Sequence, residues 1–209
     1  MSSPAATIKL RRPAAAICRA SPTDRDAVAA TITAGFFDDP VTVWLLPDIE
    51  RRREILQPLF TLYTDAYLPH GETYRTADDS GVAVWLPPGA QLHTAEQEEA
   101  FGAAVQHLGG ADADRAFQLA ETFARHHPTT EHYYLQFLAT EPAHQGKGIG
   151  SAFLRQMLER ADREGRPAYH EATTPRNRAL YERHGYVAVG QIQLPDDGPA
   201  VWPMWREPR

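Results

Sequence analysis

The chain has 209 residues, of which 43% are apolar and 23% are charged, and its formal net charge at pH 7 is -6. This length and apolar content suit one globular domain with a full core, at most with a small extra lobe, and the negative charge argues against the basic face that a nucleic-acid-binding protein needs. No apolar run reaches the roughly 18 residues of a membrane span, the N-terminal segment lacks the apolar stretch of a signal peptide, and the lone Cys18 favours a reducing, cytoplasmic setting.

The first part of the chain alternates between strand and helix patterns. Ser21 is a suitable N-cap, with Pro22 at the first helical position and Asp24 at the third. The apolar periodicity and the turn residues predict a strand at 14–20, helices at 21–37 and 49–68, paired strands at 71–77 and 81–87, and an amphipathic helical stretch at 94–126 that is interrupted by Gly109-Gly110.

The second part reads as β-α-β-α-β-β. Its strongest strand, HYYLQFLAT at 132–140, is apolar on both faces and is therefore expected near the centre of the sheet. The elements predicted after it are a helix at 150–164 that Gly165 and Pro167 end, a strand at 167–173, a short helix at 177–185, and final strands at 186–194 and 200–205.

The most informative stretch is EPAHQGKGIGS at 141–151, which lies between that strand and the following helix. Backbone N–H groups of 145–151 are expected to converge on a phosphate at the helix N-terminus. A P-loop needs GxxxxGK followed by Ser or Thr, and a dinucleotide fingerprint needs GxGxxG directly after the strand. Neither fits, which leaves the pyrophosphate of coenzyme A, or a tight turn that binds nothing.

The segment FLATEPAHQGKGIGSAFL resembles the central signature of the GNAT superfamily of N-acetyltransferases, Gln/Arg-x-x-Gly-x-Gly/Ala, through Gln145, Gly148 and Gly150. EATTPRNRALYERHGY at 171–186 resembles the next conserved block of that family. FFDDPVTVWLLPD and GPAVWPMW bring the chain closest to puromycin N-acetyltransferase-like bacterial proteins.

The resemblance implies one α+β domain over 1–209 with the GNAT fold. A mixed, mostly antiparallel sheet with a splayed central strand is expected between flanking helices, and 94–126 is expected as a helical insertion before the cofactor strand. We expect this insertion to pack over the acceptor side of the sheet and to wall the pocket. Plain core packing or a dimer contact is an equally good interpretation.

The resemblance also implies acetyl-CoA as cofactor and assigns residues to it. The loop would bind the pyrophosphate through its backbone, with Lys147 either adding a point charge or merely solvated. Asn177 would bond the phosphate or pantetheine arm, although many relatives have this Asn where Thr174 stands, and a helix N-cap is the competing interpretation. The cofactor-binding residues expected are Leu138, Ala139, Thr140, Gln145, Gly146, Lys147, Gly148, Ile149, Gly150, Ser151 and Asn177.

Two residues are the catalytic candidates by the same resemblance. Tyr181 would protonate the leaving thiolate, because a phenol stays protonated at neutral pH; a core tyrosine is the alternative. Glu171 would take the proton of the acceptor amine, or would instead orient the ammonium or form a structural ion pair.

Other polar residues are candidates for the acceptor site. Tyr134 and Gln136 lie on the strand face opposite Tyr133 and Leu135 and are expected to line that site, while His132 and Glu131 are weaker candidates for the base. Asp39 and Trp44 would border it, although Asp38-Asp39 also reads as a surface pair. No metal site is expected, because His126-His127 and the remaining histidines lack ligand spacing and read as surface residues.

The sequence therefore predicts an N-acetyltransferase that acts on a small-molecule amine by direct attack in a ternary complex. The alternatives are a non-catalytic acyl-CoA sensor and a protein or peptide acetyltransferase. The expected protein is a monomer or homodimer with no nucleic-acid or membrane partner.

Overall fold

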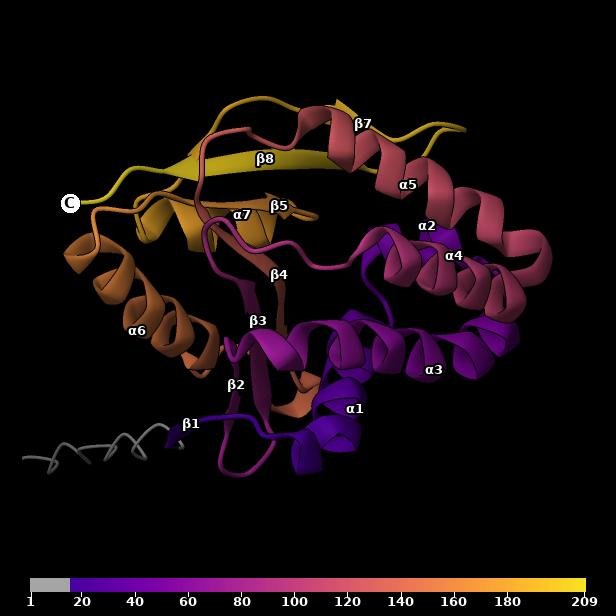
Figure 1. The fold of residues 1–209 in the computed structure, drawn as a ribbon, viewed down its shortest axis with the longest axis horizontal. Helices are drawn as coiled ribbons and strands as arrows, with labels where there is room; N and C mark the ends of the chain where they lie inside the picture. Colours follow the sequence, from indigo (N-terminus) through magenta and orange to yellow (C-terminus); the bar gives the residue numbers. More distant parts are fainter. Residues whose placement is uncertain (1–15) are drawn as a thin grey trace, which may run out of the picture.

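The computed structural model describes residues 16–209, and in them an eight-stranded, twisted sheet runs between two layers of helices (Figure 1). The strand order is β1-β2-β3-β4-β5-β8-β6, and β7 pairs with β8. The strands are β1 Ile17–Arg19, β2 Thr73–Thr76, β3 Gly81–Leu86, β4 Tyr133–Thr140, β5 Ala168–Ala172, β6 Val187–Ala188, β7 Ile192–Gln193 and β8 Ala200–Arg206. Within 16–209 only β4 and β5 pair in parallel, which confirms a mixed, mostly antiparallel sheet.

The helices divide between the two faces of the sheet (Figure 1). They are α1 Arg25–Phe36, α2 Pro40–Leu45, α3 Ile49–Tyr67, α4 Ala95–Gly109, α5 Ala113–His126, α6 Ile149–Arg163 and α7 Pro175–Arg183. The first five lie on one side and the last two on the other. Each predicted element has a counterpart within 16–209, but the single strand predicted at 186–194 is wrong, because this segment forms two separate two-residue strands, β6 and β7. Ala14 and Ala15 of the first predicted strand lie outside the described residues. None of the described helices combines the length and apolarity of a membrane crossing.

The short helix α2 escaped the sequence prediction, because six residues carry too little periodicity to stand out from a loop. Asp39 is its N-cap: Oδ1 accepts a hydrogen bond from the backbone N–H of Val41 at 2.9 Å. Pro40 follows at the first helical position, where its missing N–H costs nothing.

A bulge in β4 decides which side chains face which helical layer. Val84 pairs with Phe137 and Trp85 with Leu135, so Gln136 is an extra residue opposite no partner. Leu135 consequently packs toward α6, whereas Phe137 packs toward α1 and α3. The strand is buried on both sides and lies between β3 and β5, as its apolar pattern predicts.

The splayed central strand is confirmed. β4 and β5 pair only through Tyr133 with Ala168 and Tyr134 with Tyr169, and no pairing continues beyond these positions. The rest of β4 still pairs with β3, up to Thr140 opposite Gly81. One edge of the second half of β4 is therefore free of strand hydrogen bonds.

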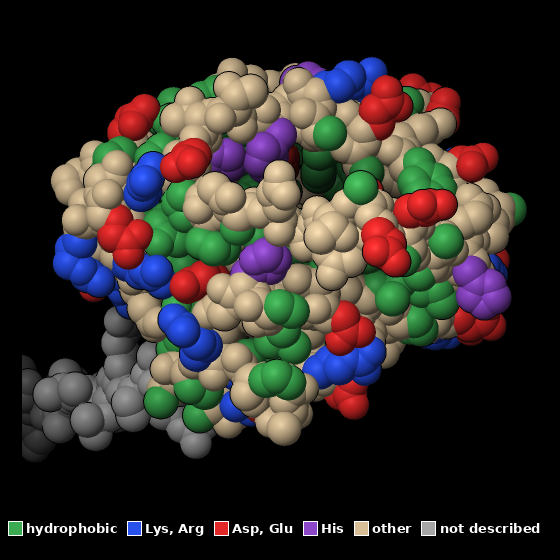
Figure 2. Space-filling model, viewed as in Figure 1, with side chains coloured by type: hydrophobic (Ala, Val, Ile, Leu, Met, Phe, Trp, Pro, Cys, Tyr) green, Lys and Arg blue, Asp and Glu red, His purple; other side chains and the backbone are tan. Residues whose placement is uncertain are grey.

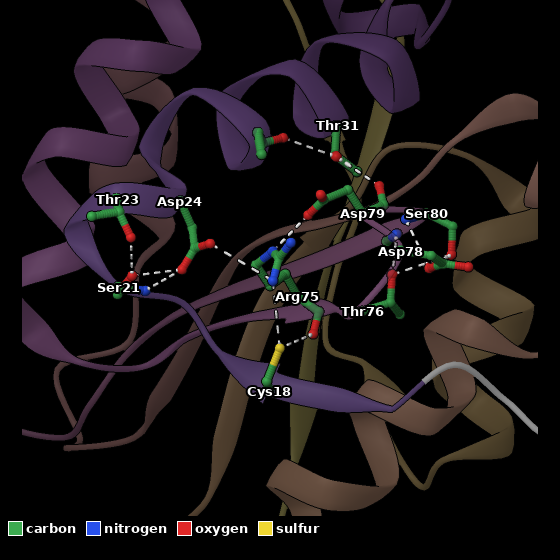
Figure 3. A network of polar contacts seen from close by, with 12 residues as sticks. Cys18, Ser21, Thr23, Asp24, Thr31, Arg75, Thr76, Asp78, Asp79 and Ser80 are labelled. Atoms are coloured by element: carbon green, nitrogen blue, oxygen red, sulfur yellow. Dashed lines mark hydrogen bonds and ion pairs between the residues drawn. The ribbon is translucent and has the colours of Figure 1, made fainter.

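A polar network ties the β2–β3 turn to α1 (Figure 3). Arg75 donates from Nε to the Asp79 carboxylate at 2.5 Å and forms an ion pair with Asp24 at 3.7 Å. Thr31 on α1 donates to the backbone carbonyl of Asp79 at 2.9 Å. The Cys18 thiol donates to the carbonyl of Arg75 at 3.5 Å. These contacts fix the start of β3 against α1.

The 94–126 insertion forms the expected helical pair and packs chiefly on other helices. Phe101 of α4 lies edge-on against Tyr63 of α3, with ring centroids 5.1 Å apart. Phe123 of α5 packs against the cluster that contains Trp44, and Arg115 donates to the Trp44 carbonyl at 2.8 Å. The pair therefore covers α2, α3 and the β7–β8 end of the sheet.

Candidate active site

The loop between β4 and α6 has the backbone that its glycines predict. Gly146 and Gly148 take φ values of 75° and 89°, in the left-handed region that favours glycine. Gly148 is the N-cap of α6 and provides no side-chain cap, so the first N–H groups of the helix lack a side-chain acceptor. A Cβ added at either glycine would meet no atom within 4 Å. This open helix N-terminus fits an anionic ligand such as a phosphate.

The loop forms one wall of a cleft of about 270 Å³. The other lining residues come from the end of α1, from the second half of β4 and from α7. The lining residues are Gly35, Phe36, Asp39, Leu138, Thr140, His144, Gln145, Gly146, Gly148, Ile149, Gly150, Ser151, Arg176, Asn177, Leu180, Tyr181 and Arg183.

Two glycines allow the walls of the cleft to approach one another. At Gly35 on α1, an added Cβ would lie 3.0 Å from the Cβ of Ala139 and 3.2 Å from the backbone nitrogen of Thr140. At Gly81 on β3, it would lie 2.5 Å from Ile149, the first residue of α6. The missing side chains therefore set the position of the helix N-terminus relative to the sheet.

We expect Gly81→Ala to lower the free energy of unfolding by about 1–3 kcal/mol, because the new methyl group overlaps Ile149 and forces the start of α6 outward. Chemical denaturation measures the change. Gly102→Ala on α4 is the matched control: nothing lies within 4 Å of the new Cβ, so it should stabilise by roughly 0.5–1 kcal/mol. Equal effects of the two changes would contradict the close contact.

Tyr181 on α7 reaches the cleft from the α6 side of the sheet. Its side chain is buried, and its ring centroid lies 3.6 Å from that of His170. Burial, reinforced by the negative charge of Asp39, raises the pKa of Tyr181 well above its usual range. The hydroxyl makes no hydrogen bond with another residue of 16–209. The group is thus a protonated donor beside the cleft.

Asp39 connects the cleft with β5. Its Oδ2 accepts a hydrogen bond from the Thr173 hydroxyl at 2.5 Å, while Oδ1 caps α2. Burial raises the pKa of Asp39, and the bonds from Thr173 and from the α2 backbone oppose that rise. The surface-pair interpretation therefore holds for Asp38, which is exposed, and is wrong for Asp39.

Glu171 on β5 does not line the cleft; it lies in a polar pocket beside the split between β4 and β5. Its Oε2 accepts a hydrogen bond from the Tyr134 hydroxyl at 2.9 Å, but Oε1 is buried without a partner. The buried hydroxyl of Tyr169 also lacks a partner. Burial raises the pKa of Glu171 to about 7, although the nearby hydroxyls of Tyr134 and Tyr169 oppose the rise. In residues 16–209 this carboxylate has no ion-pair partner.

Aromatic rings surround this pocket. His127 lies edge-on to Tyr134 at 4.7 Å and to Tyr169 at 5.2 Å, and His132 lies 5.4 Å from Tyr169. Figure 2 shows that this face is hollowed between β8 and α4, with histidine side chains at the edge of the hollow. Burial lowers the pKa of His127 to about 4, so the ring is neutral at pH 7.

The expectation that the histidines are surface residues is wrong for His127, His132 and His170. His127 packs among rings, and His132 and His170 are buried, the latter inside β5. Whether a histidine side chain is buried depends on where its segment lies in the folded sheet, and the residue type alone does not reveal this. In residues 16–209, no group of three or more His, Cys, Asp or Glu side chains is arranged to hold a metal ion.

The structure brings most of the predicted cofactor residues together in the cleft, with two exceptions. Ala139 is buried against α1, so only its backbone is near. Lys147 donates to the carbonyl of Ala143 at 2.8 Å and points away from the lining. Asn177 lines the cleft, and the N-cap interpretation is wrong for it, because Thr174 is the N-cap and accepts from the Asn177 N–H at 3.1 Å.

The predicted acceptor residues divide in the same way. Tyr134 reaches Glu171, whereas Gln136 accepts a hydrogen bond from the Tyr67 hydroxyl at 2.6 Å. Trp44 donates from its indole N–H to the Pro195 carbonyl at 3.1 Å and is buried in the packing of α2. Of the four predicted acceptor residues, only Asp39 lines the cleft; Tyr134, Gln136 and Trp44 do not.

Six lining residues were not identified from the sequence: Gly35, Phe36, His144, Arg176, Leu180 and Arg183. The arginines had a usable signal, since Arg176 and Arg183 stand seven residues apart on one short helix and so point to the same side. No sequence feature marks Gly35, because its role depends on contact with a strand that lies more than 100 residues away in the chain.

Comparisons with known proteins agree with this architecture. The acetyltransferase (GNAT) domain model matches residues 91–188. An uncharacterized N-acetyltransferase of Schizosaccharomyces pombe is 26% identical over 189 residues, covering 85% of this chain and 76% of the relative.

Solved structures extend the match to the whole fold. The crystal structure of "histone acetyltransferase HPA2 and related acetyltransferase" from Corynebacterium glutamicum is 28% identical, has a TM-score of 0.70, and covers 94% of this chain and 97% of its own. A Drosophila melanogaster polyamine N-acetyltransferase is 13% identical, has a TM-score of 0.61, and covers 92% and 99%.

Proposed function

Because the chain is an acetyltransferase with the GNAT fold, we propose that it transfers the acetyl group of acetyl-CoA to a primary amine of a small molecule, by direct attack in a ternary complex. One observation carries the proposal. The cleft that suits a phosphate ligand and the Glu171 carboxylate, which has no ion-pair partner within 16–209, lie at the same split between β4 and β5. A thioester bound along the free edge of β4 would then lie between the cleft and the Glu171 carboxylate.

The loop and the split strand would bind the cofactor. The backbone of Gln145–Ser151 would hold the pyrophosphate at the start of α6. The free edge of Leu138–Thr140 would bond the extended pantetheine arm, with Asn177 beside it on α7. Acetyl-CoA, when bound, supplies an acetyl group activated as a thioester.

Glu171 would take the proton of the acceptor. An aliphatic amine with a pKa of about 10.4 is neutral in only roughly one part in a thousand at pH 7, so a base is required. Glu171 has a pKa of about 7 and a free Oε1 in a pocket without another charge partner. Glu171 would therefore gain and lose a proton near neutral pH, as a general base requires. Tyr181, protonated in the cleft, would donate to the leaving thiolate.

The pocket also favours a small acceptor. Tyr134, Tyr169, His127 and His132 enclose Glu171 with rings, which suits a single ammonium group. A small amine also agrees with the name of the Drosophila neighbour, a polyamine N-acetyltransferase. His127 directly follows α5, so the 94–126 insertion would help to wall this pocket. The closer likeness to puromycin N-acetyltransferase-like proteins and the cytoplasmic location remain predictions.

We expect free-thiol release from acetyl-CoA with at least one member of a panel of aminonucleosides, polyamines, amino acids and arylalkylamines. With that amine, kcat should rise with pH through about 7 in the wild-type protein, as Glu171 loses its proton. Glu171→Gln should lower kcat by about 10²-fold and remove this step.

The same substitution should have an opposite effect on stability. The folded pKa of Glu171 is raised from 4.5 to about 7, so the unfolded chain loses this proton first and stability falls between about pH 4.5 and pH 7, with the full cost present above pH 7. Glu171→Gln should therefore raise the melting temperature at pH 8 and change it little at pH 4. Glu164→Gln is the control, because Glu164 also accepts from a tyrosine, Tyr133, but on the opposite side of the sheet. Unchanged kcat in a folded Glu171→Gln protein would exclude Glu171 as the base.

A further inference from the structure

Three arginines around the cleft have no acidic partner. Arg155 on α6 and Arg176 and Arg183 on α7 form no salt bridge with any residue of 16–209. Neighbours on the same helices are paired: Arg160 with Glu72 at 2.7 Å and Arg178 with Glu182 at 2.8 Å. Arg155, Arg176 and Arg183 thus carry positive charge beside the cleft or the adjacent hollow that no ion pair offsets.

The adjacent hollow, of about 210 Å³, lies between α6, α7 and the C-terminal residues. Arg183, at the end of α7, lines both this hollow and the cleft, so the two adjoin there. The other lining residues are Arg155, Leu158, Glu159, Asp162, His184, Arg206 and Arg209.

The carboxylates in this hollow do not neutralise Arg155 and Arg183. Asp162 accepts two hydrogen bonds from the Arg206 guanidinium, at 2.7 and 2.8 Å, and a third from the backbone of Arg209. Glu159 forms no ion pair with another residue of 16–209. A net positive charge therefore remains at the mouth of the hollow.

His184 responds to this charge and links the hollow with the glycine loop. Its pKa is lowered by burial and by the nearby Arg155, Arg183 and Arg206. Its Nε2 is hydrogen-bonded to the Ser151 hydroxyl at 3.0 Å, and Ser151 lines the cleft. The positive hollow and the loop are thus linked through the contact of His184 with Ser151.

We propose that Arg155 and Arg183 bind the ribose 3′-phosphate of coenzyme A, an inference that rests on the proposed function. Coenzyme A carries two separate phosphate groups, the pyrophosphate and the ribose phosphate. Arg176 lies by the glycine loop, where it donates to Gln145 at 3.4 Å. Arg183 stands seven residues later on α7, about 10 Å along the helix. The spacing provides one cationic position for each phosphate group.

The experiment compares calorimetric titrations of coenzyme A and of dephospho-coenzyme A, which lacks the 3′-phosphate. Wild-type protein should bind coenzyme A about tenfold more tightly, since two exposed guanidinium–phosphate pairs contribute modestly each. The preference should shrink at high salt. The Arg155→Gln/Arg183→Gln protein should bind both ligands with the affinity of the wild type for dephospho-coenzyme A.

Arg163→Gln is the matched control, because Arg163 is also exposed and unpaired on α6 but lies outside both the cleft and the hollow. It should keep the full preference. Equal wild-type affinities for the two ligands, or a preference that survives the double substitution, would overturn the assignment and leave the proposed function intact. Failure of the wild type to bind either ligand would instead overturn the proposed function itself.

Discussion

Gly148→Glu is expected to abolish detectable acetyl-CoA binding. Gly148 caps α6 with a φ of 89° and lines the cleft, and a side chain there would project where no protein atom lies within 4 Å. A glutamate would put a carboxylate at the position proposed for the pyrophosphate, and like charges repel. It would also occupy the space into which the first N–H groups of α6 point. Isothermal titration of the purified variant measures the loss.

Backbone strain must be separated from this electrostatic effect. Gly165, beyond the other end of α6, has a φ of 62°, and nothing lies within 4 Å of an added Cβ. Gly165→Glu therefore introduces the same charge and a similar strain on the same helix, away from the cleft, and should leave acetyl-CoA affinity unchanged. Gly148→Ala adds strain without charge and should weaken binding less than Gly148→Glu. A folded Gly148→Glu protein with wild-type affinity would reject the loop as the pyrophosphate site.

The sequence identifies the cofactor side of the candidate site well because that side is mostly local. A strand, a glycine loop and a helix follow one another over 133–163. The left-handed backbone at Gly146 and Gly148 favours glycine whatever the rest of the fold is. The order of the elements then determines the rest of this wall. Arg176 and Arg183 complete it from α7 and could have been found from their spacing on one helix face.

The acceptor side is harder to predict from the sequence, because it is assembled from segments that are far apart in the chain. The environment of Glu171 includes Tyr134 from β4 and His127 from the end of α5, and the raised pKa of Glu171 arises from this assembly. The bulge at Gln136 changes which neighbours face α3, and no turn residue marks it. Trp44 shows the converse: an aromatic residue near a catalytic block can be used wholly in packing.

Tyr181→Phe is expected to lower kcat by about 10²-fold or more while leaving acetyl-CoA affinity nearly unchanged. The phenylalanine ring keeps the tilted contact with the His170 ring and the packing of α7, so only the hydroxyl is removed. Burial raises the pKa of Tyr181, so the hydroxyl is protonated across the working pH range and can donate a proton to a thiolate. Steady-state kinetics measures the loss, and the absence of a pre-steady-state burst establishes that chemistry limits turnover.

Tyr186→Phe is the matched control for this change. Tyr186 belongs to the same core cluster, its ring centroid is 5.8 Å from that of Tyr181, and its buried hydroxyl also lacks a partner. It does not line the cleft, so its replacement should leave kcat intact and should not destabilise the fold. If Tyr181→Phe retains full kcat under chemistry-limited conditions, Tyr181 is a core residue whose hydroxyl has no part in the reaction. If both substitutions lower kcat equally, the effect comes from the packing of α7 on β5, because only one of the two hydroxyls reaches the cleft.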